Sequence, residues 1–161
     1  MPLFEQQKID DPAKWRAHYA FGGALLLGFA MEAPGRLSIV MTATKSGAHP
    51  ALVGLGDVAK SVLPKEAFVA TVRVSCSGVR GLDWIGRPGS LSDLKESTGA
   101  YGRVETFEVA KLAIPEKDLW PGVPQPFVAA DKPLDLWHGR LASRDFAIQW
   151  FCEAASLREG A

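Results

Sequence analysis

The segment Ala67–Cys76, read AFVATVRVSC, constrains the fold of this chain more than any other stretch. Its residues alternate between an apolar side, which holds Val72, Val74 and Cys76, and a mixed side, which holds Arg73. Side chains of a strand point alternately to its two faces, so this period of two predicts a strand with one buried face. Such a strand is typical of an antiparallel sheet. We expect the mixed side to face solvent or a partner.

Two further strands are predicted on either side of a turn. Ala24–Met31 alternates large and small residues, and Leu37–Thr44 alternates apolar and other residues. Between them lies Ala33-Pro34-Gly35, in which Pro and Gly stand in the order that a type II turn uses. The pattern predicts that the two strands pair back on each other as a hairpin.

Helices are predicted near both ends of the chain. Asp10-Asp11-Pro12 opens the first with an Asp cap and Pro at the first helical position, and Gly22-Gly23 ends it. The second is predicted over Ser143–Leu157, where Phe146 and Trp150 belong to an apolar stripe at helical spacing. We expect this second helix to pack across the buried face of the sheet.

The remaining chain supplies one more strand and long connections. Arg103–Ile114 alternates with one slip of phase, which predicts a strand with a β-bulge near Val109-Ala110. Ser77–Gly102 is rich in glycine and Pro115–Pro133 in proline, so both are predicted as long loops. We therefore expect a single domain over residues 1–161 of the α+β class. It would have an antiparallel sheet of about four strands, with an N-terminal and a C-terminal helix packed on it.

Charge and apolar runs exclude some classes of function. The chain has 18 Lys and Arg and 18 Asp and Glu, without a basic block, so no nucleic-acid binding is expected. The longest apolar run, Ala20–Met31, falls well short of the about 20 residues of a membrane helix, so no membrane insertion is expected. Only Cys76 and Cys152 are cysteines, and no signal-peptide pattern opens the chain. These features predict a reduced, cytoplasmic location.

One segment resembles a nucleotide-binding loop in its glycine spacing. Gly54–Ala59 fits the dinucleotide pattern G-x-G-x-x-G/A, whose glycines let a pyrophosphate approach backbone amides. The context is poor, because only three residues separate Pro50 from Gly54 and no first strand fits there. A plain connection is the better interpretation, and dinucleotide binding is kept as a weak alternative.

Catalytic and metal-binding patterns are missing from the sequence. Cys76 precedes a glycine-containing loop, but it lies on the apolar side of its strand, where a thiol stays inert. His18, His49 and His138 show no metal-ligand spacing. His138 with Asp135 is the best candidate for a polar pair in a pocket. We expect no cofactor and no metal, and the missing motifs favour a protein that is not an enzyme.

Tryptophan and arginine residues gather in two long segments, Arg80–Gly102 and Leu119–Arg140. These residue types are enriched where proteins hold partners, although tryptophans also cover the edges of cores. We predict a non-catalytic interaction or assembly domain, such as an immunity-like inhibitor, an adaptor or a virion-type structural subunit. Its partner would be another protein or copies of itself in a homo-oligomer. The alternative is a small-molecule-binding domain or enzyme with a pocket between sheet and loops. The predicted partner-binding residues are Arg80, Trp84, Arg87, Trp120, Phe127, Trp137 and Arg140.

Overall fold

Antiparallel β-structure dominates the protein. The computed structural model describes residues 8–86, 102–115, 133–143 and 146–160, with only the backbone described for 84–86, 113–115 and 133–134. The strands are β1 (Lys8–Ile9), β2 (Tyr19–Ala20), β3 (Leu25–Ala33), β4 (Arg36–Lys45), β5 (Val69–Ser77), β6 (Gly81–Gly86), β7 (Gly102–Pro115), β8 (Pro133–Ser143), β9 (Phe146–Cys152) and β10 (Ala154–Glu159). The helical pieces are η1 (Pro12–Lys14), α1 (Trp15–His18), α2 (Asp57–Ser61) and η2 (Lys65–Phe68). The predicted α+β fold with about four strands was wrong, because the described residues form ten strands and only short helices.

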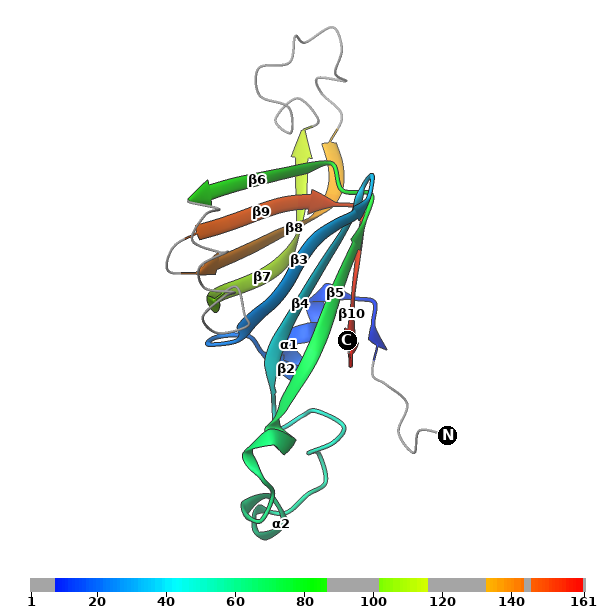
Figure 1. Cartoon of the computed structure of the whole chain (residues 1–161). Helices are drawn as coiled ribbons and strands as arrows, with labels where there is room; N and C mark the ends of the chain where they lie inside the picture. The colour runs from blue at the N-terminus through cyan, green and yellow to red at the C-terminus, as the bar shows by residue number, and fades with distance from the viewer. Residues whose placement is uncertain (1–7, 87–101, 116–132, 144–145, 161) are drawn as a thin grey trace, which may run out of the picture.

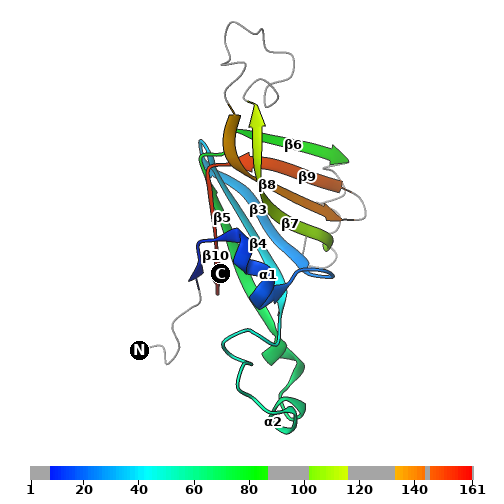
Figure 2. The same cartoon turned by 180° about the vertical axis from the view of Figure 1, so that it is seen from behind.

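The strands form one strongly bent sheet in the order β1-β10-β5-β4-β3-β7-β8-β9-β6, with β2 paired to the end of β4. Its two halves, β10-β5-β4-β3 and β7-β8-β9-β6, splay apart (Figures 1 and 2). One hydrophobic core takes side chains from both halves, including Val72 and Leu157 from the first and Ile148 and Trp150 from the second.

Two seams hold the halves together. At one seam β3 pairs briefly with β7, where Leu25 lies opposite Arg103. At the other seam, two stretches of chain pass from one half to the other. β5 of the first half continues into β6 of the second, and β9 of the second half continues into β10 of the first. Backbone hydrogen bonds continue between the two stretches where they turn from one half into the other, which is called the corner below. The Arg80 N–H donates to the Phe151 carbonyl at 2.8 Å, and the Glu153 N–H donates to the Ser77 carbonyl at 3.1 Å. Strands that bend from one sheet into another are the usual corners of orthogonal β-packing.

The central strands confirm the local sequence patterns. β3 and β4 form the predicted hairpin, with Phe29 opposite Ile39. Gly35 in its turn has φ +74°, which favours glycine. In β5 the apolar side chains are buried as predicted, while Arg73 faces solvent and lies 3.4 Å from Glu32. The predicted facing of this strand is therefore confirmed.

The predicted C-terminal helix was wrong. Ser143–Leu157 contains β9 and most of β10, and the buried side of β9 carries Phe146, Ile148, Trp150 and Cys152. A spacing of four residues returns to the same face of a helix and also to the same face of a strand, so Phe146 and Trp150 fit both patterns. The decisive positions were Ile148 and Cys152, which are apolar at the spacing of two that only a strand places inward.

The predicted bulge was misplaced, although its strand is present. The register of β7 against β8 shifts between Val104 and Thr106, not near Val109-Ala110. The phase slip read from the sequence arose because Ala110 and Leu112 are apolar but exposed. Apolar side chains on a solvent-facing side are common, and they blur a period-two pattern.

The N-terminal helical segment begins as predicted but is shorter. The Asp11 carboxylate accepts the Ala13 N–H at 3.0 Å, which caps η1, and α1 ends at His18. Trp15 is buried, stacks on Phe107 of β7 with ring centroids 6.2 Å apart, and donates its Nε1–H to the Ile9 carbonyl at 3.0 Å. Tertiary packing therefore stabilises this segment, since so short a helix is not stable alone.

Residues 46–68, called the arm below, connect β4 to β5 and contain α2 and η2. Both views show the α2 part of the arm projecting beyond the end of the sheet (Figures 1 and 2). None of the described helices is long and apolar enough to cross a membrane.

Candidate functional site

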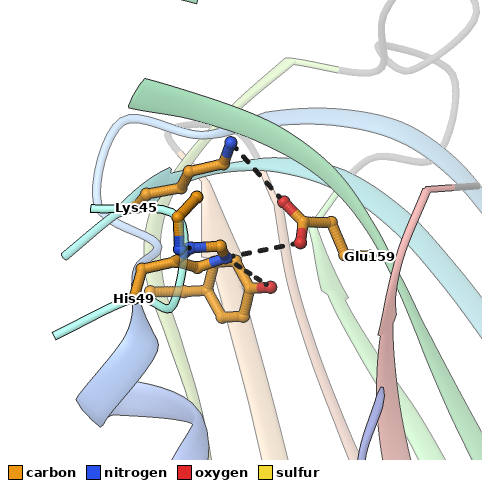
Figure 3. Close-up of polar contacts among 5 residues, drawn as sticks. Lys45, His49 and Glu159 are labelled. Atoms are coloured by element: carbon orange, nitrogen blue, oxygen red, sulfur yellow. Dashed lines mark hydrogen bonds and ion pairs between the residues drawn. The ribbon is translucent and has the colours of Figure 1, made fainter. Parts of the chain in front are cut away.

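A buried polar cluster lies where the arm leaves β4. It joins Tyr19 of β2, Lys45 at the end of β4, His49 of the arm and Glu159 at the end of β10. His49 Nε2 lies 3.2 Å from Tyr19 Oη and 3.3 Å from Glu159 Oε2. Lys45 Nζ lies 3.8 Å from Glu159 Oε1 (Figure 3). The carboxylate of Glu159 is thus shared by side chains from three other elements.

The protonation state of His49 follows from its hydrogen bonds. The Ala51 backbone N–H donates to His49 Nδ1 at 3.0 Å, so Nδ1 is an acceptor and the ring proton is on Nε2. Burial lowers the pKa of His49, although the neighbouring Glu159 carboxylate acts in the opposite direction. Burial and Glu159 raise the pKa of Tyr19, so its phenol stays protonated and hydrogen-bonds to Glu159. In the folded protein, the neutral imidazole of His49 and the neutral phenol of Tyr19 both contact the carboxylate of Glu159.

This cluster is better suited to holding elements together than to chemistry. Tyr19 and His49 are almost completely buried, so a substrate cannot reach them. The donors of Tyr19, Lys45 and His49 converge on Glu159, which leaves no activated nucleophile among them. Removing one side chain of such a network leaves its partners buried without a hydrogen bond. The resulting loss of stability is larger than the net contribution of the hydrogen bonds themselves. The arm is therefore fixed at its base to the C-terminal strand.

We predict that the protein loses stability as the pH falls below about 6.5, the usual pKa of histidine. The folded pKa of His49 lies below the unfolded one, so the unfolded chain binds more protons in this range and the free energy of unfolding falls. Protonated Nδ1 also could not accept the Ala51 N–H. Glu159 on β10, Lys45 on β4 and His18 on α1 are the charged or titratable groups that act on the ring.

Urea unfolding between about pH 5 and pH 7.5 measures this effect. The variant His49→Gln should flatten the dependence of the unfolding midpoint on pH. His138→Gln is the matched control, because His138 lies on β8, away from the cluster, and the control should keep the wild-type slope. Equal slopes in wild type and His49→Gln would contradict the assignment of the neutral, buried imidazole.

A groove with aromatic walls lies along β7, on the side of η1 and α1. A cavity of about 330 Å³ has walls that include Trp15, Arg16, Phe107, Lys111 and Trp137. An adjoining cavity of about 350 Å³ shares Arg16 and Phe107 with it. Volumes of this size are typical of sites that take up a ligand or side chains of a partner. The groove combines aromatic walls with charged groups, including Arg16 and Lys111.

Charges are unevenly distributed around this groove. Glu108 lies 3.3 Å from Arg16 and 3.9 Å from Arg140, so one carboxylate serves two guanidinium groups. Lys111 Nζ lies 5.0 Å from the centre of the Trp137 ring, a cation–π arrangement. The Lys111 end of the groove is therefore positively charged.

The structure places four of the predicted partner-binding residues, and they do not form one surface. Arg80 lies at the corner, where its Nη2 is 2.6 Å from Glu153 Oε1. The backbone of Trp84 lies in β6 opposite Ile148. Trp137 lines the groove, while Arg140, three residues further along β8, points to the opposite face of the strand. Arg87, Trp120 and Phe127 lie outside the described residues.

The pair His138 and Asp135 does not form a polar site. The two residues are three positions apart on β8, which puts their side chains on opposite faces of the sheet. His138 Nε2 lies 3.3 Å from Gln149 Oε1, and its ring stacks on Phe151 at 4.7 Å. This histidine is held by its neighbours on β9.

The glycine pattern at Gly54–Ala59 lacks the structure that a dinucleotide needs. The helix behind it, α2, has five residues, and the strands on either side of the arm, β4 and β5, are antiparallel. The fingerprint requires a parallel strand–helix–strand unit. Among the described residues, no group of three or more His, Cys, Asp or Glu is placed to hold a metal ion.

Both cysteines are buried free thiols, and the predicted place of Cys76 on the buried side of its strand is confirmed. The contact with Cys152 and burial raise the pKa of Cys76, so its thiol stays protonated.

Sequence reasoning missed both the polar cluster and the groove. Tyr19, His49 and Glu159 come from distant parts of the chain, and no spacing relates them. The groove arises because η1 and α1 pack beside β7, which also leaves no local pattern. No protein-family model matches the chain, and no curated protein matches its sequence.

Proposed function

We propose that the protein is a non-catalytic interaction or assembly domain that docks on another polypeptide through its arm. The observation that supports this is a group of exposed aliphatic side chains on the projecting segment. Val58 is 81% exposed, Val62 77% and Val53 60%, and Leu55 is also exposed. Single exposed aliphatic residues are ordinary, but several on one short projection typically mark a contact surface.

The position and charge of the arm suit such a role. It extends away from the sheet (Figure 1), so a partner can contact it without obstruction from the two halves. The buried cluster of Tyr19, His49 and Glu159 fixes its base, which lowers the entropy lost when a partner binds. Its exposed charges include Lys65 and Glu66, of opposite sign, and the chain as a whole has no net charge to oppose self-association.

Light scattering of the wild-type protein over a range of concentrations, together with affinity purification from the source cells, tests the proposal. We expect the wild type to associate with itself or with a defined protein. The double variant Val58→Ser, Val62→Ser should weaken that association by roughly tenfold or more, because burying an aliphatic side chain contributes about 1.5–3 kcal/mol.

The control is the double variant Met31→Ser, Leu112→Ser. These two side chains are also exposed and apolar, but they lie on β3 and β7 rather than on the arm. Association should survive this change. The proposal fails if the wild type is a monomer without a partner, or if both double variants lose association equally.

A further inference from the structure

Few of the described residues pair with the edge of β7 that faces away from β8, which is called the open edge below. β7 pairs with β8 along nearly all of its residues, but its other edge pairs with β3 only at Gly102 and Arg103. Val104 adds backbone hydrogen bonds to Gly23 and Ala24. Beyond Val104, no strand of the described chain pairs with this edge. An open edge offers unpaired N–H and C=O groups to another strand.

The aromatic groove runs along this open edge. Five consecutive residues of β7, from Phe107 to Lys111, line the cavity of about 330 Å³. Successive side chains of a strand point to opposite faces, so a cavity over one face would contact every second residue. A cavity that contacts all five reaches the strand edge, and its contact with Trp137 of β8 shows that it also extends over one face of β7 and β8. Its other wall comes from η1 and α1, with Pro12, Trp15 and Arg16.

The length of the groove matches a short strand. The adjoining cavity contacts β7 from Glu105 to Phe107, so the two cavities together follow the strand from Glu105 to Lys111. At about 3.3 Å per residue, this is a length of roughly 20 Å. The rings of Trp15, Phe21 and Phe107 form the buried floor of the groove, with the rings of Phe21 and Phe107 4.8 Å apart. Val109 and Trp137, which are only partly buried, give an extended segment the apolar surface that its side chains can contact.

The two ends of the groove carry side chains of opposite charge. Lys111 at one end makes no salt bridge with a described residue, and Glu105 lies at the other end. Glu108 in between is already shared by Arg16 and Arg140. An occupant with an acidic side chain at the Lys111 end would complement this arrangement.

We infer that β7 accepts an added strand from a partner protein. The strand is an extended segment with alternate apolar side chains in the aromatic groove and an acidic side chain at Lys111. Backbone hydrogen bonds to the open edge would supply affinity, and the groove would supply specificity, as in other cases of strand addition. This surface is separate from the arm, so the inference does not depend on the function proposed for the arm.

The test uses the full chain and synthetic peptides of about eight residues, a common strand length. The peptides alternate Val, Leu or Phe with Ser and carry Asp or Glu at one end; a matched set carries Lys there. Amide hydrogen exchange should show that acidic peptides protect residues of β7 between Glu105 and Lys111. The same peptides methylated on alternate backbone nitrogens should bind at least about tenfold more weakly, because methylation removes the strand's donors.

A charge reversal tests the polarity. Lys111→Glu should weaken binding of the acidic peptides by about tenfold or more and strengthen binding of the Lys peptides. Lys14→Glu is the control, because Lys14 is exposed on η1 and does not line the groove. It should leave both affinities unchanged.

Three results would overturn the inference. One is the absence of protection on β7 by every acidic peptide at millimolar concentration. Another is equal binding of the methylated peptides, with phenylacetate as an effective competitor, which would identify a small-molecule pocket. The third is an equal effect of Lys14→Glu and Lys111→Glu.

Discussion

Replacing Gly139 with alanine should destabilise the protein by about 3 kcal/mol, at the upper end of the usual cost of overpacking a core. Gly139 of β8 lies opposite Trp150 of β9. A Cβ atom at this position would lie 2.1 Å from Trp150 Cε2, and Cβ contacts below 3.0 Å essentially do not occur. The indole is completely buried and packs 6.3 Å from the Phe107 ring, so it cannot move aside without disturbing the core between the halves.

Gly28→Ala is the matched control for this change. Gly28 also lies within a strand, β3, but a Cβ there would be 3.8 Å from Val40 Cβ, an ordinary contact. We expect this variant to change the free energy of unfolding by less than about 1 kcal/mol, since removing a glycine also restricts the unfolded chain. Urea unfolding measures both. A similar loss in the two variants would show that Trp150 does not fill the space above Gly139.

Removing the side chain of Trp15 should have an effect of similar or larger size. Trp→Ala changes in cores cost about 3–5 kcal/mol, and Trp15 is only 2% exposed. Its ring stacks on Phe107, and its Nε1–H bonds to the Ile9 carbonyl. Without it, η1 and α1 lose their main contact with β7. We therefore expect faster amide exchange over residues 8–20 as well as a lower urea midpoint.

The variant Trp15→Phe distinguishes the contribution of the aromatic ring to stability from that of its hydrogen bond. Phenylalanine keeps an aromatic face for Phe107 but cannot donate to the Ile9 carbonyl, so the expected loss is about 1–2 kcal/mol. If the alanine variant is no less stable than the phenylalanine variant, the ring stacking contributes nothing. Trp15 would then not be the residue that docks this segment.

The parts of the fold that follow from local residue patterns could be predicted. The alternation in β5, the Pro34-Gly35 turn and the Asp11 cap each act over a few residues, and each was identified correctly. β9 was read as a helix because its i, i+4 spacing is shared by both structures. β6 was read as loop because glycine stands at both of its ends.

The candidate site depends on tertiary structure and could not be predicted. Tyr19, His49 and Glu159 meet only because β2 and β10 both reach the end of β4 and β5. The groove requires that β3 diverge from β7 after Gly102 and Arg103, which is set by the bend of the whole sheet. Trp137 was chosen for its residue type and does line the groove, whereas Arg140 was chosen on the same ground and faces the other way.

The corner at Arg80 and Glu153 also determines when the protein can fold during synthesis. β5 and β6 are made well before their partners β10 and β9, with Ser77 pairing to Ala154 and Gly81 to Phe151. Neither half can be completed before β9 and β10 leave the ribosome. Until then the outer edges of β5 and β6 lack their partners, and unpaired edges favour association with other chains. The nascent chain therefore exposes these edges from the synthesis of β5 and β6 until that of β9 and β10, whose addition completes both halves in quick succession.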